Sequence, residues 1–100
     1  SVNTELMVEF ISGQGVHAAI AYSHLYRVHF DPSEGITLEF TDHHVTIRGR
    51  GLRAGYQKLR QHRVAFVAEA DRPTAALLDE QEPVVTGLVV TPKRELATRE

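Results

Sequence analysis

Apolar and polar residues alternate with a period of two over several short segments of the chain, a pattern typical of strands that bury one face. Turn sequences such as SGQG and DPSEG separate these segments and let the chain reverse direction. Within 16–22 the alanines also allow a helix, but the alternation and the glycines just before it favour a strand. The seven predicted strands are 5–11, 16–22, 26–30, 36–40, 45–49, 64–70 and 84–91.

The segment ITLEFTDHHVTIRG, residues 36–49, predicts the best-defined hairpin. A register that places all its apolar side chains on one face leaves Thr41 to His44 in the turn. A slip of one residue would move every apolar side chain to the wet face, so the pattern restricts the register. The predicted pairs are 40–45, 38–47 and 36–49.

The period changes after this hairpin. In LRAGYQKLRQH, residues 52–62, the apolar positions Leu52, Tyr56 and Leu59 recur at i, i+4 and i+7, which predicts an amphipathic helix. A segment between two prolines, TAALLDEQ at 74–81, predicts two further helical turns.

These elements predict a mainly β fold of the α+β type. We expect a small, strongly bent antiparallel sheet or barrel of about seven short strands with one helix near 52–62, because a flat sheet of this size would leave its edges open. One hundred residues suffice for one hydrophobic core. The predicted organisation is a single domain over 1–92 and a charged, flexible tail over 93–100.

Composition narrows the class of protein. Hydrophobic residues make up 42% and charged residues 24%, as in ordinary globular domains. The chain has no cysteine, which excludes disulfides, thiolate metal sites and cysteine nucleophiles. No apolar run is long enough for a membrane span and no export signal is visible, so we expect a cytoplasmic protein.

The net charge of −2 hides an uneven distribution. Residues 43–68 contain six lysines and arginines and no acidic residue, whereas residues 69–82 are strongly acidic. The basic block begins with RGRG at 48–51, where glycines before a helix can present backbone N–H groups to an anion. The candidate anion- or partner-binding residues are Arg48, Arg50, Arg53, Lys58, Arg60 and Arg63.

Two interpretations of the basic block remain open. The cations can contact phosphates, or they can pair with the acidic block of a second copy and so build a homo-oligomer. Aromatic residues for base stacking are few, and we expect Tyr22, Tyr26 and Tyr56 in the core. With the acidic net charge, this favours the assembly interpretation.

The six histidines suggest metal binding at first sight, but their spacing does not support it. His43 and His44 are adjacent at a predicted turn, so their side chains diverge, and no H-E-x-x-H or similar motif is present. We interpret them as the tip of a hairpin. We predict no catalytic residue, no bound metal and no cofactor.

One stretch carries a family resemblance. IAYSHLYRVHFD, followed by a hairpin and a helix that begins LRAGYQKL, resembles uncharacterised bacterial proteins with small curved β-barrels, of the Sm-like or pleckstrin-homology-like type. The resemblance covers roughly residues 15–70. An Sm-like relative implies ring assembly, and a pleckstrin-homology-like relative implies phosphoinositide or peptide ligands.

The sequence therefore predicts a non-enzymatic binding or assembly module that associates with itself. The alternative is a nucleic-acid- or phosphate-binding module of the Sm-like type that uses the basic segment 48–63. The ligand and the size of the oligomer stay open.

Overall fold

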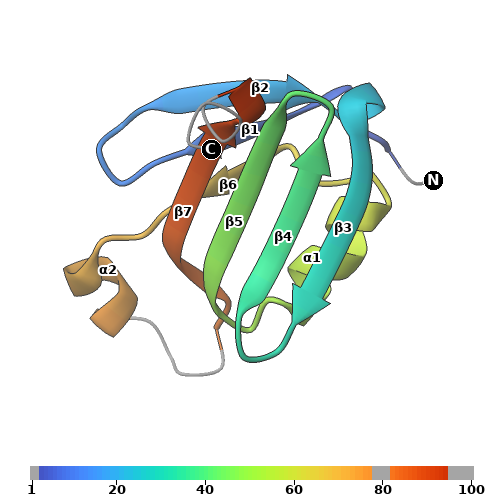
Figure 1. Ribbon diagram of the computed structural model, residues 1–100. Coiled ribbons are helices and arrows are strands. Elements are labelled where there is room, and N and C mark those ends of the chain that lie inside the picture. The colour runs from blue at the N-terminus through green and yellow to red at the C-terminus, as the bar shows by residue number, and fades with distance from the viewer. Residues whose placement is uncertain (1–2, 78–81, 95–100) are drawn as a thin grey trace.

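A computed structural model describes residues 3–77 and 82–94 of the chain. Seven strands, two α-helices and one 3-10 turn form within these residues, as the sequence pattern predicted for the strands (Figure 1). The helices are α1 (Arg53–Arg60) and α2 (Arg72–Leu77). The strands are β1 (Met7–Ile11), β2 (His17–Ala21), β3 (Leu25–Asp31), β4 (Gly35–Phe40), β5 (His43–Arg50), β6 (Phe66–Ala68) and β7 (Val84–Pro92).

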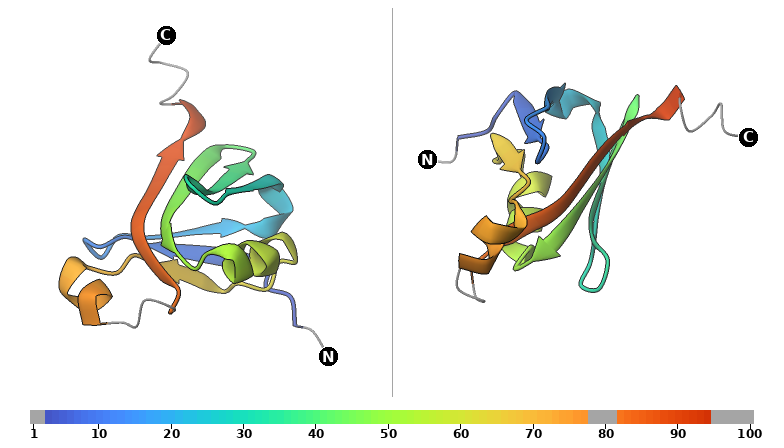
Figure 2. Two further views of the ribbon diagram at one scale, coloured as in Figure 1. Left: turned by 90° about the horizontal axis from the view of Figure 1, so that it is seen from below. Right: turned by 90° about the vertical axis from the view of Figure 1, so that its left-hand side faces the viewer.

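The fold is mainly β and of the α+β type, as predicted, but the strands form two sheets rather than the predicted single bent antiparallel sheet or barrel. A three-stranded sheet has the order β2-β1-β6, and a four-stranded sheet has the order β3-β4-β5-β7. Every neighbouring pair is antiparallel except β1 and β6, which run parallel. The two sheets lie one behind the other, with α1 on the side of the four-stranded sheet that faces the smaller sheet (Figures 1 and 2).

The chain passes from one sheet to the other through the 3-10 turn Tyr22–His24. The Tyr22 side chain is buried and its hydroxyl donates a hydrogen bond of 2.7 Å to the carbonyl oxygen of Val64. The same hydroxyl accepts the Val64 N–H at 3.2 Å. One phenol therefore ties this crossing point to the segment that leads into β6.

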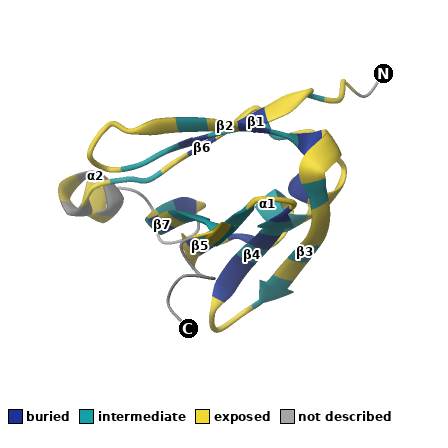
Figure 3. Cartoon of the chain, turned by 45° about the horizontal axis from the view of Figure 1, so that its top comes forward, coloured by how far each residue is buried: buried dark blue, intermediate teal, exposed yellow. Residues whose placement is uncertain are grey.

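The core lies between the inner faces of the two sheets and under α1. Six of the seven strands bury residues there, and β3 adds the partly buried Val28 and Phe30. Figure 3 shows how burial varies along the strands. Phe10 of β1 meets Phe40 of β4 edge to face, with ring centroids 6.1 Å apart and planes at 79°. This geometry is favourable for aromatic pairs, and the pair joins the two sheets.

The predicted hairpin forms, but its register differs from the prediction by two residues. Ile36 pairs with Ile47 and Leu38 pairs with Val45. The turn therefore shortens to Thr41 and Asp42 alone. Because the shift is even, every apolar side chain keeps its predicted face, and the hydrophobic pattern could not distinguish the two registers.

Both helices start close to their predicted positions. α1 occupies Arg53–Arg60 within the predicted 52–62, and it buries Leu59 against the core. Leu52 and Tyr56 pack against the same core. α2 begins two residues earlier than predicted, and residues 78–81 of the predicted helix lie outside the described part of the chain.

The segment 16–22 is a strand, as predicted from its alternation, over His17–Ala21. Lys93, the first residue of the predicted tail, contacts Glu39 on the four-stranded sheet. Residues 95–100 lie outside the described residues, so the flexible tail stays a prediction. None of the helices in the described ranges is long and apolar enough to cross a membrane.

Candidate functional site

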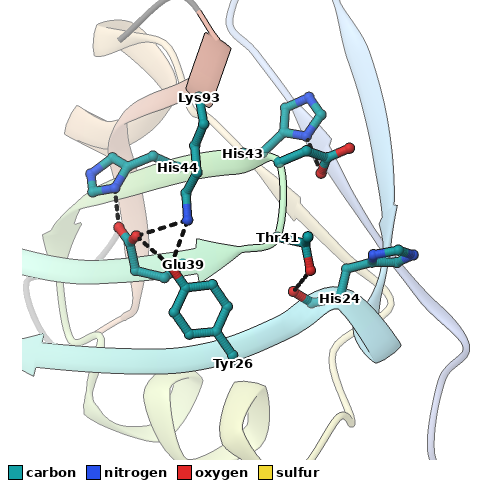
Figure 4. A network of polar contacts seen from close by, with 8 residues as sticks. His24, Tyr26, Glu39, Thr41, His43, His44 and Lys93 are labelled. Atoms are coloured by element: carbon teal, nitrogen blue, oxygen red, sulfur yellow. Dashed lines mark hydrogen bonds and ion pairs between the residues drawn. The ribbon is translucent and has the colours of Figure 1, made fainter. Parts of the chain in front are cut away.

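His43 and His44 lie in β5 rather than at the hairpin tip, because the turn is two residues shorter than predicted (Figure 4). His43 Nδ1 is 2.8 Å from Asp42 Oδ1, and His44 Nδ1 bonds Glu39 Oε1 on the neighbouring strand. The hydrogen bond from His43 lowers the pKa of Asp42. The two imidazoles thus have separate carboxylate partners.

The four-stranded sheet carries a polar network on its outer face, centred on Glu39. Its carboxylate contacts His44 on one side, and on the other side its Oε2 lies 3.2 Å from Lys93 Nζ. Lys93 Nζ also lies 2.6 Å from the Tyr26 hydroxyl and 4.6 Å from the centroid of the Tyr26 ring. These contacts hold the Tyr26 ring in place (Figure 4).

The network shifts the pKa of the charged groups at its centre. Burial of the Glu39 carboxylate raises its pKa, but hydrogen bonds from Lys93 and His44 outweigh this effect and leave the pKa below its ordinary value. The Tyr26 contact and the Glu39 carboxylate raise the pKa of Lys93. Glu39 is therefore ionised in the folded state under conditions where an ordinary glutamate takes up a proton.

This shift predicts an acid-dependent loss of stability. The pKa of Glu39 is lower in the folded chain than its ordinary value of 4.5. Its contribution to the free energy of unfolding is therefore present above pH 4.5 and is lost as the pH falls through the lowered pKa,. We expect Glu39→Gln to be less stable than the wild type near neutral pH and the difference to shrink in acid. Urea unfolding across this range measures it, and a difference that does not change with pH would contradict the assignment.

The histidines do not converge on a metal site in the described part of the chain. No group of three or more histidine, aspartate or glutamate side chains there is arranged to hold an ion. His62 instead stacks on Tyr22, with ring centroids 4.6 Å apart and planes at 14°, and His17 contacts Glu9 on the three-stranded sheet.

The six predicted cations lie on two sides of the molecule. Arg48 projects from the outer face of the four-stranded sheet and its Nη1 lies 3.3 Å from Glu34 Oε2. Arg50 ends β5, and its Nε donates to the Glu82 carbonyl at 3.4 Å. The other four cations lie on or just after α1, behind that sheet; they are Arg53, Lys58, Arg60 and Arg63.

The space between β3 and α1 brings several cationic and aromatic side chains together. One hollow of about 350 Å³ lies at the C-terminal end of α1. Arg27 on the edge strand β3 and Arg60 on α1 both border it, together with Tyr26 and Tyr56. The complete lining is Leu25, Tyr26, Arg27, Val28, Tyr56, Arg60 and His62.

A second hollow, of about 330 Å³, lies at the N-terminal end of the same helix. Arg50 and Arg53 line it together with Phe30. The Phe30 ring stacks on Tyr56, with centroids 5.6 Å apart, and the Arg53 guanidinium lies 5.6 Å from the Phe30 centroid. The stacked pair therefore separates two adjoining hollows along one helix.

We call these two hollows the cationic groove; its defining side chains are Arg27, Arg50, Arg53 and Arg60 with Tyr26, Phe30 and Tyr56. Among the described residues, no acidic side chain lines either hollow. Three of the six sequence-predicted cations belong to the groove. The basic block did not reveal Arg27, because that residue lies on β3, outside the block.

Two of the three tyrosines are more exposed than the sequence predicted. Tyr26 was expected in the core, but it is 62% exposed, because a bulge between residues 25 and 27 interrupts the alternation of β3. Tyr56 is only half-buried, with part of its ring at the groove. Tyr22 alone is fully in the core, as predicted.

A third hollow, of about 340 Å³, lies between α1, β6 and β7. All of its lining residues are apolar or glycine, including Ile36, Ile47 and Leu59 on its inner side. Gly55 of α1 borders it, and a side chain at this position would meet open space. Among the described residues it has no charged or polar side chain that could orient a ligand, so the cationic groove is the stronger candidate site.

Comparisons with protein-family models, curated proteins and solved structures found no match for this chain. The likeness to Sm-like and pleckstrin-homology-like barrels therefore stays a prediction, and any functional assignment has to depend on the geometry of the site.

Proposed function

We propose that this protein is a non-enzymatic binding module that holds a phosphate-bearing ligand in the cationic groove. Single-stranded nucleic acid is the ligand whose chemistry fits it best. The observation that carries the proposal is the gathering of arginines and aromatic rings at the edge of the sheet where β3 packs beside α1. The predicted basic segment contributes Arg50, Arg53 and Arg60, and β3 adds Arg27.

Each component of the groove has a matching group in a single strand. Arginine guanidinium groups bind phosphate oxygens with two hydrogen bonds in a fixed geometry. Exposed aromatic faces stack on bases of any sequence, worth about 1–3 kcal/mol per base. Tyr26 is the most exposed of the rings. Its hydroxyl contacts Lys93 and Glu39 on the outer face of the sheet, and the residue borders the same hollow as Arg27 and Arg60 at the edge strand β3.

The ordering of the groove before binding also supports this function. Arg53 already lies against the Phe30–Tyr56 stack, so less side-chain freedom is lost when a ligand arrives. The acidic net charge of −2 opposes long-range attraction of a polyanion. Binding should therefore depend on the local groove and weaken steeply with salt.

The double substitution Arg53→Ala with Arg60→Ala tests the phosphate contacts. We expect the Kd for a labelled, mixed-sequence single strand to rise by roughly tenfold at low salt, which is 1.4 kcal/mol. Loss of two phosphate contacts should also flatten the dependence of log K on log salt by about 1.4, at about 0.7 per contact. Fluorescence anisotropy over a range of salt concentrations gives both values.

Two further variants make the test specific. Arg48→Ala with Lys58→Ala removes the same charge away from the groove and should leave both values close to the wild type. Tyr26→Ala should weaken binding without changing the salt slope, because stacking releases no counterions. Equal losses in the two double variants, or no salt-sensitive binding by the wild type, would refute the proposal.

A further inference from the structure

The outer face of the three-stranded sheet is apolar. The inner face of this sheet is buried through Val8, Phe10, Ile20 and Val67, and the outer residues alternate with them. Most of these outer residues have no polar group on their side chains. The apolar outer positions are Met7, Ile11, Ala19, Ala21, Phe66 and Ala68.

Two of these side chains are large and remain in contact with solvent. Phe66 is 62% exposed and Met7 is 47% exposed. Phe66 pairs with Glu9 of β1, and Met7 pairs with Ala21 of β2, so the apolar positions extend over all three strands. Figure 3 shows exposed residues along this sheet. We call these six residues, together with Glu9 and His17 on the same side of the sheet, the apolar face.

The other sheet of the molecule is different. The outer face of the four-stranded sheet carries mainly polar and charged side chains, as expected for a sheet face in water. It includes Arg27, Glu39, His44 and Arg48. One sheet thus presents a solvated face and the other an apolar one, and contiguous apolar patches on the surface mark contact sites.

The charges within the apolar face point to its partner. Glu9 and His17 lie on neighbouring strands, with Oε2 3.1 Å from Nδ1, and both side chains are about half-exposed. The face therefore carries one acidic and one basic group side by side. A two-fold axis in the plane of the contact that passes between them places each carboxylate, an acceptor, over the partner's imidazole, a donor that is also its opposite charge when protonated, so the face is complementary to a copy of itself.

We propose that the protein forms a two-fold homodimer in which the apolar faces of two three-stranded sheets pack against each other. Face-to-face packing of two sheets is an ordinary way to build a β core, and it would cover Met7 and Phe66 of both copies. The two-fold contact is closed, so it ends at two copies. The proposal is independent of the cationic groove, which lies along β3 and α1.

This interface differs from the pairing of basic and acidic blocks that the sequence suggested. Part of the acidic block is occupied within the chain, since Glu69 Oε1 accepts the Gly13 N–H at 2.9 Å. An interface of apolar side chains should persist in about 1 M salt, where the Debye length is about 3 Å. An assembly held by opposite charge blocks should dissociate there.

Sedimentation velocity of the whole chain over the micromolar range tests the dimer. We expect the wild type to sediment at twice the mass of the chain in both low and high salt. Phe66→Lys should raise the dimer Kd by at least roughly tenfold, because it places a charge among the apolar side chains of the contact. Val89→Lys makes the same change at a 58% exposed position on the other sheet and should leave the dimer intact.

Charge exchange tests the two-fold arrangement. His17→Glu alone places two carboxylates opposite one another across the axis and should weaken the dimer, whereas His17→Glu with Glu9→Lys places opposite charges there and should restore it. Circular dichroism confirms that each variant remains folded. A wild type that is monomeric throughout, a dimer lost in high salt, an equal effect of Val89→Lys, or no rescue in the double variant would overturn the proposal.

Discussion

Replacing Gly35 with alanine is expected to destabilise the fold by about 3 kcal/mol or more, combining backbone strain with steric overlap. Gly35, at the start of β4, has a φ of +104°, a backbone conformation that is strained for any residue with a Cβ atom. A Cβ built there lies 2.2 Å from the carbonyl oxygen of Ile47. This oxygen belongs to the backbone of β5, which pairs with β4, so the two strands would have to separate to relieve the contact.

Two other glycines separate the causes of this loss. Gly15 has a φ of +84° but open space around a new Cβ, so Gly15→Ala measures strain alone, at about 1–3 kcal/mol. Gly55 lies in α1 with open space and no strained φ, so Gly55→Ala should stabilise by up to about 1 kcal/mol. The midpoints of guanidinium unfolding rank the three variants by stability. If Gly35→Ala lowered the free energy of unfolding no more than Gly15→Ala does, β4 and β5 would not lie as close together at Gly35 as the structure shows.

The same hairpin shows how far the sequence determines a register. The pattern of 36–49 correctly predicted two paired strands and the face of each side chain. It could not select between registers that differ by two residues, because both bury the same side chains. The length of the turn decides between them, and the stretch Thr41–His44 contains no glycine to mark a tight turn,.

The division into two sheets could not be predicted from the sequence, for a different reason. β1 and β6 pair in parallel across more than fifty residues of chain, and no local periodicity records such a contact. β6 is only three residues long, too short for its pairing to be predicted from alternation. The predicted antiparallel sheet followed from joining neighbours in the sequence, which holds for β3, β4 and β5 but fails at the 3-10 turn.

The candidate site was predicted in part. The basic block contained three arginines of the cationic groove, because they lie on α1 or immediately before it. Arg27 and Tyr26 come from β3, and they reach the groove only because β3 packs beside the helix. The bulge at Tyr26 also turns outward a ring that alternation placed in the core. Such a site combines two elements whose proximity is a property of the fold alone.

The buried phenol of Tyr22 predicts a loss of stability in alkali. Tyr22 is 2% exposed, and its burial, which outweighs the hydrogen bond to Val64, raises its pKa from the ordinary value of 10.0 to about 12. A group whose pKa is raised by folding stabilises the fold below its unfolded pKa. That contribution is lost as the pH rises from 10.0 towards 12, by about 1.4 kcal/mol per pH unit in this window.

Unfolding by urea at several alkaline pH values measures this slope, with Tyr22→Phe and Tyr56→Phe as a matched pair. Tyr22→Phe should lose about 1–3 kcal/mol near neutral pH, because both the N–H and the carbonyl of Val64 lose their partner. The variant should also lose the part of the alkaline slope that belongs to Tyr22. Tyr56→Phe leaves the buried phenol in place and should keep that slope. Lys93, whose pKa is also raised, contributes equally to the wild type and to Tyr22→Phe, so it cancels in their difference. Parallel pH profiles for the wild type and Tyr22→Phe would show that the phenol is not buried at the crossing between the sheets.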